Sequence, residues 1–180
     1  MTTEGLWLNR GETAIYRSDW VNLVVADVVM PDGTQVDHHV VRMPNQAAGC
    51  VLVQDEEVLL LYRHRFITDT WGWEIPAGKI DAGETPAVAA RREAIEESGW
   101  DPGEVTPLCA FHPGNGITDQ RFHIFTSHAP VHVGAPTDIN EATRIVWHDT
   151  ESLRALLATG RISDGLSFAA LSYALASHAI

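Results

Sequence analysis

The sequence has few basic residues for its length. It contains 12 Lys and Arg against 24 Asp and Glu among 180 residues, which gives a formal net charge of -12. Such a charge opposes binding to the phosphate backbone of nucleic acids and to anionic membrane surfaces. We therefore expect no nucleic-acid partner. Small phosphate compounds stay open as ligands, because carboxylate-bound divalent cations reverse the sign of the local field.

Cysteine and long apolar runs are scarce too. The two cysteines, Cys50 and Cys109, lie in apolar strand-like surroundings, and we expect both to be reduced and buried. No apolar run approaches the ~18 to 20 residues that a transmembrane helix needs. The first residues also lack the basic-then-apolar pattern of a signal peptide. We therefore expect a cytoplasmic protein without membrane contacts.

Apolar and β-branched runs predict the order strands, helix, strands, helices. Residues 13–43 are typical of two extended strands joined by a turn at PDG, residues 31–33. The runs AAGCVLVQ and VLLLYRHRF, around the polar break DEE, predict a second hairpin. Further strands are expected at EVTPLCAFH, RFHIFTSH and ATRIVWHD, followed by helices at about 151–159 and from 163–165 onward. This order favours an α/β (α+β) fold with mixed layers rather than repeated βαβ units.

The best-marked helix lies within PAGKIDAGETPAVAARREAIEESGW, residues 76–100. Thr85 can cap it, Pro86 suits its first position, and Gly99 can end it in the left-handed conformation. The preceding segment EIPAGKIDAGE contains prolyl and glycyl residues. We expect them to exclude a regular element there.

Three glutamates of this helix share one face. At 100° per residue, Glu97 lies about 40° from Glu93, and Glu96 lies about 60° to the other side. Val88 and Ile95 point roughly the opposite way, and alanines between them allow a sheet to approach closely. A solvated acidic face is the plain alternative, because glutamate is a good helix former. The carbonyl-rich loop beside the acids instead favours a site for a hard divalent ion such as Mg²⁺.

These residues resemble the box of the Nudix hydrolases, which reads G-x5-E-x7-R-E-U-x-E-E-x-G-U, with U bulky and apolar. The matching residues are Gly78, Glu84, Arg92, Glu93, Ala94, Glu96, Glu97, Gly99 and Trp100. Ala94 and Trp100 depart mildly from the pattern, and neither is a ligand position. The resemblance implies a Nudix-like α/β/α sandwich with a mixed sheet. It also implies Mg²⁺ or Mn²⁺ as cofactor, and hydrolysis of a nucleoside diphosphate linked to another group.

The resemblance divides the box residues into two groups. The metal ligands would be Glu93, Glu96 and Glu97, of which Glu93 and Glu97 are the catalytic pair. The residues that orient the loop and the ligands would be Gly78, Glu84 and Arg92. An arginine suits that supporting role because it can hold a carboxylate through two parallel hydrogen bonds.

Outside the box, LYRHRF, WEIPAGKIDAGE, GITDQRFHIF and NEATRIVW look like the ADP-ribose pyrophosphatase branch of the family. The carbonyl of Ala77 would then be a further metal ligand. Arg65 and Arg63 would contact the diphosphate, although surface arginines that balance nearby acids are the plain alternative. Glu74 could contact ribose or a metal-bound water, and Trp20 is a candidate for stacking on a nucleobase.

The branch implies hydrolysis of ADP-ribose to AMP and ribose 5-phosphate. Asn115 stands in PGNG where the branch often has proline, so another nucleotide sugar, such as GDP-mannose, or a dinucleotide is an alternative substrate. The implied general base is Glu141, with Asp138 and Glu97 as alternatives. A domain that senses a nucleotide without hydrolysing it is the competing class. Such domains usually lose box glutamates, and this sequence retains them.

The chain is expected to contain two regions. Residues 1–46 form an N-terminal strand region, and residues 47–180 form the hydrolase domain. The N-terminal strands carry more apolar residues than the box domain would cover. By the same resemblance we expect them to support a homodimer.

Overall fold

The structure is a computed structural model that describes residues 5–138 and 142–180. The chain divides into two units. The first comprises Met1–Asn45 with His112–Gln120, and the second comprises Gln46–Phe111 with Arg121–Ile180. The segment His112–Gln120 therefore groups with the N-terminal strands, although it lies far from them in the sequence.

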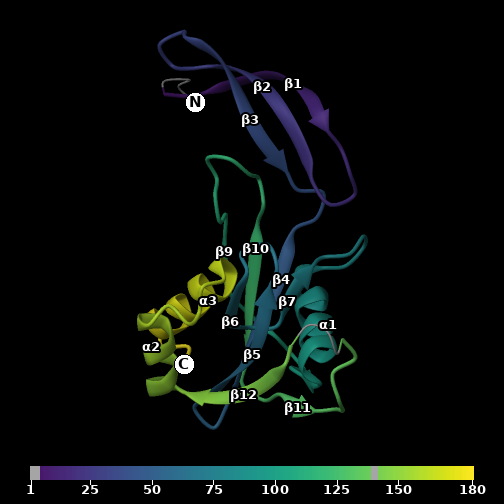
Figure 1. Cartoon of the computed structure of the whole chain (residues 1–180), viewed down its shortest axis with the longest axis vertical. Coiled ribbons are helices and arrows are strands. Elements are labelled where there is room, and N and C mark those ends of the chain that lie inside the picture. The colour runs from purple at the N-terminus through teal and green to yellow at the C-terminus, as the bar shows by residue number, and fades with distance from the viewer. Residues whose placement is uncertain (1–4, 139–141) are drawn as a thin grey trace. The chain divides into compact units, whose positions relative to one another are not determined.

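The first unit is a three-stranded antiparallel sheet in the order β1-β2-β3 (Figure 1). Its strands are β1 (Leu8–Tyr16), β2 (Asn22–Val29) and β3 (Gln35–Arg42). The expected turn at residues 31–33 joins β2 to β3. The expectation of only two strands was wrong, because the chain also reverses between β1 and β2. The Ser18 hydroxyl forms that turn: it accepts the N–H of Val21 at 3.0 Å and donates to the Val21 carbonyl at 2.9 Å.

The second unit is built on a seven-stranded mixed sheet in the order β12-β5-β4-β10-β9, with β6 paired to β5 and β7 to β4. Its strands are β4 (Ala47–Gln54), β5 (Glu57–Arg65), β6 (Thr70–Glu74), β7 (Ala77–Lys79), β9 (Thr106–Phe111), β10 (Phe122–Ser127) and β12 (Arg144–Asp149). The pairing of β4 with β10 is parallel, and the other pairings are antiparallel. A short ribbon adds β8 (Trp100–Asp101) and β11 (Val131–His132).

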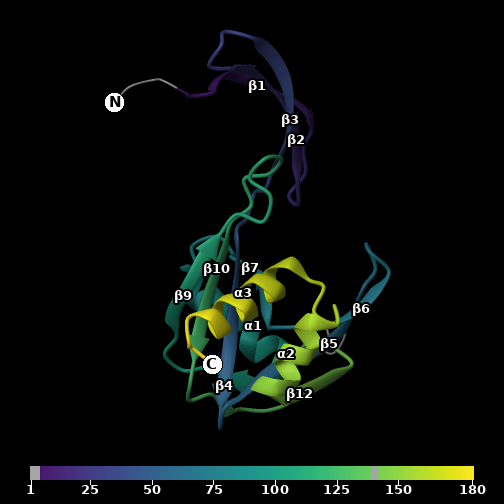
Figure 2. The same cartoon turned by 90° about the vertical axis from the view of Figure 1, so that its left-hand side faces the viewer.

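Helices cover both faces of this sheet. α1 (Pro86–Ser98) lies on one face, while α2 (Thr150–Ala158) and α3 (Gly165–Ala176) lie on the other (Figures 1 and 2). The strands β4 and β5 are buried on both sides, so their side chains alternate between two cores. Val51 and Leu60 face the α2–α3 core, whereas Leu52 and Leu59 face the α1 core. The expected mixed sheet between helices is confirmed.

The ends of α1 agree with the sequence signals. The Thr85 hydroxyl accepts the N–H of Val88, Pro86 begins the helix, and Gly99 ends it with φ 75°. A Cβ at Gly99 would lie 2.0 Å from the Gly134 carbonyl oxygen, so this position also needs glycine for space. Ala90 and its neighbours pack on the sheet, while Val88 is 54% exposed. The alanines, rather than the larger apolar residues, bring the helix close to β4.

The segment between β6 and α1 contains one regular element that the sequence did not predict. β7 pairs antiparallel with β4, with Ala77 opposite Gly49. A Cβ at Gly49 would lie 2.9 Å from the Cβ of Ala77, so the missing side chain allows this close approach. The strand holds the loop carbonyls next to α1.

The two cysteines are free. Cys50 is buried, as expected, and burial raises the pKa of its thiol to about 12. Cys109 is only half-buried, because its strand β9 is the last of the sheet order. No helix within residues 5–138 and 142–180 is long and apolar enough to cross a membrane.

Candidate active site

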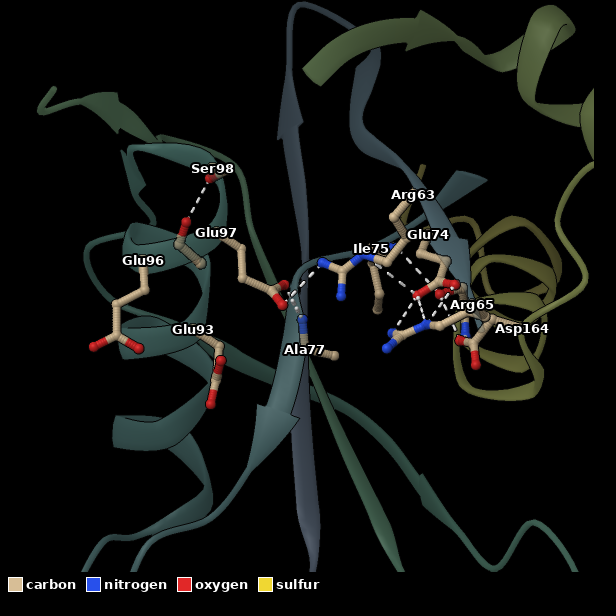
Figure 3. Close-up of polar contacts among 12 residues, drawn as sticks. Arg63, Arg65, Glu74, Ile75, Ala77, Glu93, Glu96, Glu97, Ser98 and Asp164 are labelled. Atoms are coloured by element: carbon tan, nitrogen blue, oxygen red, sulfur yellow. Dashed lines mark hydrogen bonds and ion pairs between the residues drawn. The ribbon is translucent and has the colours of Figure 1, made fainter. Parts of the chain in front are cut away.

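Four elements of the second unit bring the principal polar side chains together (Figure 3). Arg63 comes from β5, Glu74 from the end of β6, Ala77 from the start of β7, and Glu97 from the last turn of α1. These residues are distant in sequence, and the sheet pairings of β5 with β6 and of β4 with β7 bring them together. The site therefore depends on strand register as much as on the helix.

Glu97 is the most buried acid of the helix face. It is only 4% exposed, and its two oxygens have different partners. Oε1 lies 2.8 Å from Nη2 of Arg63, and Oε2 accepts the backbone N–H of Ala77 at 3.0 Å. Burial raises the pKa of Glu97 to about 7, against the opposing effect of the Arg63 guanidinium. The two bonds thus fix the orientation of the carboxylate. Its burial means that the charged form costs free energy unless a further cation is near.

Arg63 is buried rather than displayed to a ligand. Its side chain is 3% exposed, and its Nε lies 3.7 Å from Oε2 of Glu74. Arg63 therefore stands between Glu97 on α1 and Glu74 on β6 (Figure 3). The arginine balances two acids that the sheet places inside the protein.

Arg65 differs from Arg63 in exposure. Its side chain is 47% exposed, although it also binds Glu74. Its Nε lies 3.0 Å from Oε1 and 3.2 Å from Oε2, and its Nη2 lies 2.5 Å from Oε2. Glu74 is nearly fully buried, so one carboxylate positions both arginines of β5. Of the two, only Arg65 exposes much of its side chain to solvent.

Arg92 connects the other acids of the helix to the loop before it. It donates to both oxygens of Glu84 at 2.8 and 3.0 Å, to Glu93 at 2.7 Å and to Glu96 at 3.0 Å. It also donates to the carbonyl of Lys79 at 3.0 Å. These bonds lower the pKa of Glu84 to about 2 and raise the pKa of Arg92. The orienting role expected for Glu84 and Arg92 stays a prediction.

Gly78 lies directly against Glu93. A Cβ at this position would stand 2.2 Å from Oε1 of Glu93, so any larger residue would have to displace the carboxylate. Burial also raises the pKa of Glu93, despite its bond to Arg92. The absence of a side chain at Gly78 thus lets the loop lie against the Glu93 carboxylate.

The chemistry of this donor set fits a hard divalent ion. Glu93, Glu96 and Glu97 offer carboxylate oxygens on one helix face, and the residue that bonds Glu97, Ala77, also carries the expected carbonyl ligand. Each of the three acids is bonded to an arginine. Within the described ranges, no group of three His, Cys, Asp or Glu side chains is gathered closely enough to hold a metal ion. Binding an ion through all three carboxylates would therefore require these side chains to move closer together.

Of the expected site residues, Trp20 is not part of this cluster. Trp20 belongs to the first unit, in the turn between β1 and β2, and is 76% exposed. Glu141 lies outside the described residues. On one side of it, Asp138 donates its backbone N–H to the carbonyl of Glu96 at 3.1 Å, and on the other, Thr143 donates to the carbonyl of Tyr62 at 2.9 Å. The chain before and after Glu141 is thus tied to α1 and to β5.

The contribution of α3 to this site was not predicted from the sequence. The Ser167 hydroxyl accepts the backbone N–H of Ile75 at 3.1 Å and donates to Asp164 at 2.8 Å. Ile75 directly follows Glu74, so α3 fixes the chain where it leaves β6. The residues SDG predicted only the start of a helix. No local signal tied Ser167 to a segment more than ninety positions earlier.

The chain matches a known protein family and is similar to proteins of named activity. A NUDIX domain model matches residues 43–170. A CMP-5'-(N-acetyl-N-hydroxy-3-aminopropyl)phosphonate hydrolase of Streptomyces rubellomurinus (strain ATCC 31215) is 43% identical over 157 residues, which cover 86% of this chain and 75% of that protein. An ADP-ribose pyrophosphatase of Bacillus subtilis (strain 168) is 30% identical over 111 residues, covering 62% of this chain and 60% of that protein.

The fold has a counterpart among solved structures. A crystal structure of an ADP compounds hydrolase matches with a TM-score of 0.84 at 17% identity, covering 98% of this chain and 96% of that one. At this identity the likeness shows the fold alone. The matched family segment contains the acidic helix, the loop before it and both arginines of β5. The family resemblance drawn from the box is therefore confirmed, and the chain belongs to the NUDIX family of hydrolases.

Proposed function

We propose that this enzyme hydrolyses the diphosphate linkage of a nucleoside diphosphate derivative with the help of Mg²⁺ or Mn²⁺, and that ADP-ribose is a substrate. The observation that carries the proposal is the buried carboxylate of Glu97, aimed at the loop before α1 by the N–H of Ala77. Relatives named for the hydrolysis of ADP-ribose and of a CMP-linked phosphonate support this class of linkage.

The residues that would hold the ion are Glu93, Glu96 and Glu97, with the carbonyl of Ala77. Once bound, a divalent ion neutralises phosphate oxygens and lowers the pKa of water. The arginine contacts of the three acids support this assignment, because they would supply positive charge where an ion would otherwise act. Arg63 and Arg92 therefore keep the site folded, while the helix face stays acidic enough to attract a cation.

Arg65 is the residue that would contact the diphosphate. Its side chain is half-exposed, and its guanidinium is bonded to Glu74, which is itself buried. Arginine favours phosphate oxygens, because its planar guanidinium can bind them through several N–H groups at once. The role of Arg63 is then to neutralise Glu97 and Glu74 rather than to touch substrate. The possible contact of Glu74 with ribose stays a prediction.

The hydrolytic step needs a base. In the proposed step a water oxygen attacks one phosphorus, the bridging P–O bond breaks, and its electron pair leaves with the departing phosphate. Glu141 accepts the proton of the water. The bonds from Asp138 to Glu96 and from Thr143 to Tyr62 support this assignment, because they tie the flanking chain to the elements that carry Glu97 and Arg63.

The first unit would serve self-association. Trp7, Ile15 and Trp20 are exposed there, and all nine residues of β1 are exposed. A second copy of the chain could cover this apolar surface, as the sequence predicts for residues 1–46. Light scattering coupled to size-exclusion chromatography would test this. A monomer at micromolar concentration would contradict it.

A substrate screen tests the function. Purified protein with Mg²⁺ or Mn²⁺ is incubated with ADP-ribose, GDP-mannose, a CMP-linked phosphonate, a dinucleotide and nucleoside triphosphates, and products are separated by chromatography. Release of AMP from ADP-ribose supports the proposal. The 43% identity to the Streptomyces protein makes the CMP-linked phosphonate the second candidate. Cleavage of triphosphates alone, or of no compound, would reject the proposal.

A further inference from the structure

A cavity of about 400 Å³ adjoins the arginines of β5. One wall is the β5–β6 hairpin, including Arg65, Thr70 and Glu74, and the other is Ser163–Gly165 at the start of α3. All of these residues belong to the second unit. Figure 3 shows Asp164 beside the Arg65–Glu74 pair. The volume is within the range of about 300–1,000 Å³ that small-molecule pockets span, toward its small end.

The strand register places this cavity on the same face of the hairpin as Arg63. Thr70 is paired with Arg65, and Gly72 with Arg63, so these four side-chain positions share one face. Arg63 reaches Glu97 from that face. The cavity and the acidic helix are therefore reached from the same side of β5, with Arg65 between them.

The lining is polar but not basic. Thr68, Thr70 and Ser163 offer hydroxyls, and Asp164 offers a carboxylate. Among the described residues that line the cavity, Arg65 is the only basic one. The Thr68 and Thr70 hydroxyls lie 2.7 Å apart. Such a set can donate to and accept from the hydroxyls of a sugar, whereas a second phosphate would call for more positive charge.

Gly72 leaves space on the floor of the cavity. A Cβ there would stand 3.3 Å from the hydroxyl of Ser163, so a larger residue would press on the opposite wall. The absence of a side chain at Gly72 thus lets β6 lie close to the Ser163 segment and leaves the cavity beside them open. Ile67, at the rim, is 83% exposed and could cover a bound group.

From these contacts we infer that the cavity between the β5–β6 hairpin and Ser163–Gly165 binds the sugar on the far side of the diphosphate from the nucleoside. This inference rests on the proposed function for the identity of the diphosphate. Arg65, at the border, would bind the phosphate, and the threonine and serine hydroxyls with Asp164 would bind the sugar. The cavity would thereby select substrates that carry a small hydroxylated group on the second phosphate.

The inference is tested by filling the cavity from either wall. Thr70→Trp fills it from β6, and Ser163→Phe fills it from the α3 side. The matched control is Thr106→Trp, which places the same side chain at an exposed position on β9, the last strand of the sheet order. Thermal melts followed by circular dichroism establish that each variant folds. Agreement between the two filling variants separates loss of space from a disturbance of Arg65, because Thr70 is the cross-strand partner of Arg65 and Ser163 lies on the opposite wall.

Saturation-transfer NMR with ADP-ribose and metal-free protein gives a readout that needs no turnover. The expected result is saturation of the distal ribose protons by the wild type and by Thr106→Trp. Both filling variants should lose this transfer while the adenine protons keep theirs. Absence of transfer to the distal ribose in the wild type, or its persistence in both filling variants, would overturn the inference.

A kinetic comparison separates the cavity from the chemistry. Wild type and variants are assayed with ADP-ribose and with ADP methylated on its second phosphate, which lacks the distal sugar. Filling the cavity should lower kcat/KM for ADP-ribose by at least about tenfold and leave the methyl ester unchanged. An equal loss on both compounds would count against a sugar subsite. If wild type cleaves neither compound, the proposed function fails, and the NMR result still decides the subsite.

Discussion

Arg63 and Glu97 form an ion pair at 2.8 Å in which both side chains are at least nine-tenths buried. The pair joins the central strand β5 to the acidic helix α1. Burial is the larger influence on Glu97, whose pKa is raised to about 7 even beside a guanidinium. The stability of the metal-free protein should therefore depend on the protonation of this one side chain.

The first prediction concerns pH. The pKa of Glu97 in the folded protein lies above that of an unfolded glutamate, which is about 4.3. Protonation of Glu97 therefore stabilises the folded protein fully below about pH 4.3, and this stabilisation is lost as the pH rises through 7. Between pH 5.5 and 8 the metal-free wild type should lose on the order of 2 kcal/mol of unfolding free energy from this group. Glu97→Gln should remove most of this dependence. Urea unfolding at both pH values, with EDTA present, measures it.

The second prediction separates the two arginines of β5. Removing one member of a buried pair costs about 3–5 kcal/mol, so Arg63→Leu should be strongly destabilising. Arg65→Leu should lower the unfolding free energy by less than Arg63→Leu does, because Arg65 is half-exposed and buried Glu74 still has Arg63 nearby. The same variant should lower kcat/KM on ADP-ribose by about a hundredfold, since it removes the proposed phosphate contact. Equal losses of stability in both variants would refute the different roles.

The third prediction concerns space beside Glu93. Gly78→Ala would place a methyl group 2.2 Å from Oε1 and force the carboxylate away. We expect calorimetry to show Mg²⁺ affinity at least about tenfold weaker. Gly116→Ala is the matched control, because a Cβ there meets nothing within 4 Å. Unchanged Mg²⁺ affinity in Gly78→Ala would show that the position of Glu93 does not matter for the ion.

The fourth prediction tests the base. Glu141→Gln should lower kcat by about 10²–10⁴ and leave Mg²⁺ affinity unchanged, because general bases contribute rate rather than metal binding. Asp138→Asn is the comparison, since it retains the backbone N–H that bonds the Glu96 carbonyl. A larger loss in Asp138→Asn than in Glu141→Gln would move the role to Asp138.

The sequence predicted α1 well because the signals are local. Thr85, Pro86 and Gly99 each act within one turn of the helix end, and the structure uses all three as expected. The β4–β5 hairpin was predictable for the same reason: the polar break Asp55–Glu57 lies between two apolar runs. Structure that depends on interactions among a few neighbouring residues can be predicted directly from the sequence.

Features that depend on strand register were not predictable in this way. Arg63 and Arg65 look equivalent in LYRHRF, yet one is buried against Glu97 and the other is half-exposed. The distinction arises only when α1 and β6 are placed around β5. The extra turn at Ser18 was missed for a different reason: SDW contains neither proline nor glycine, which are the strongest turn signals. The partnership of Ser167 with Ile75 had no local signal at all.

The hydrogen bond between Ile75 and Ser167 connects α3 to the active site. In the proposed mechanism α3 supplies no catalytic residue, yet this bond holds the chain at the end of β6. Ile75 lies between Glu74, which orients Arg65, and the loop that reaches Glu97. A small shift of α3 would therefore change the angle at which β6 ends, and with it the spacing between the arginine and the acids. Substrate preference in this enzyme could consequently be tuned by substitutions in α3 that never touch the substrate.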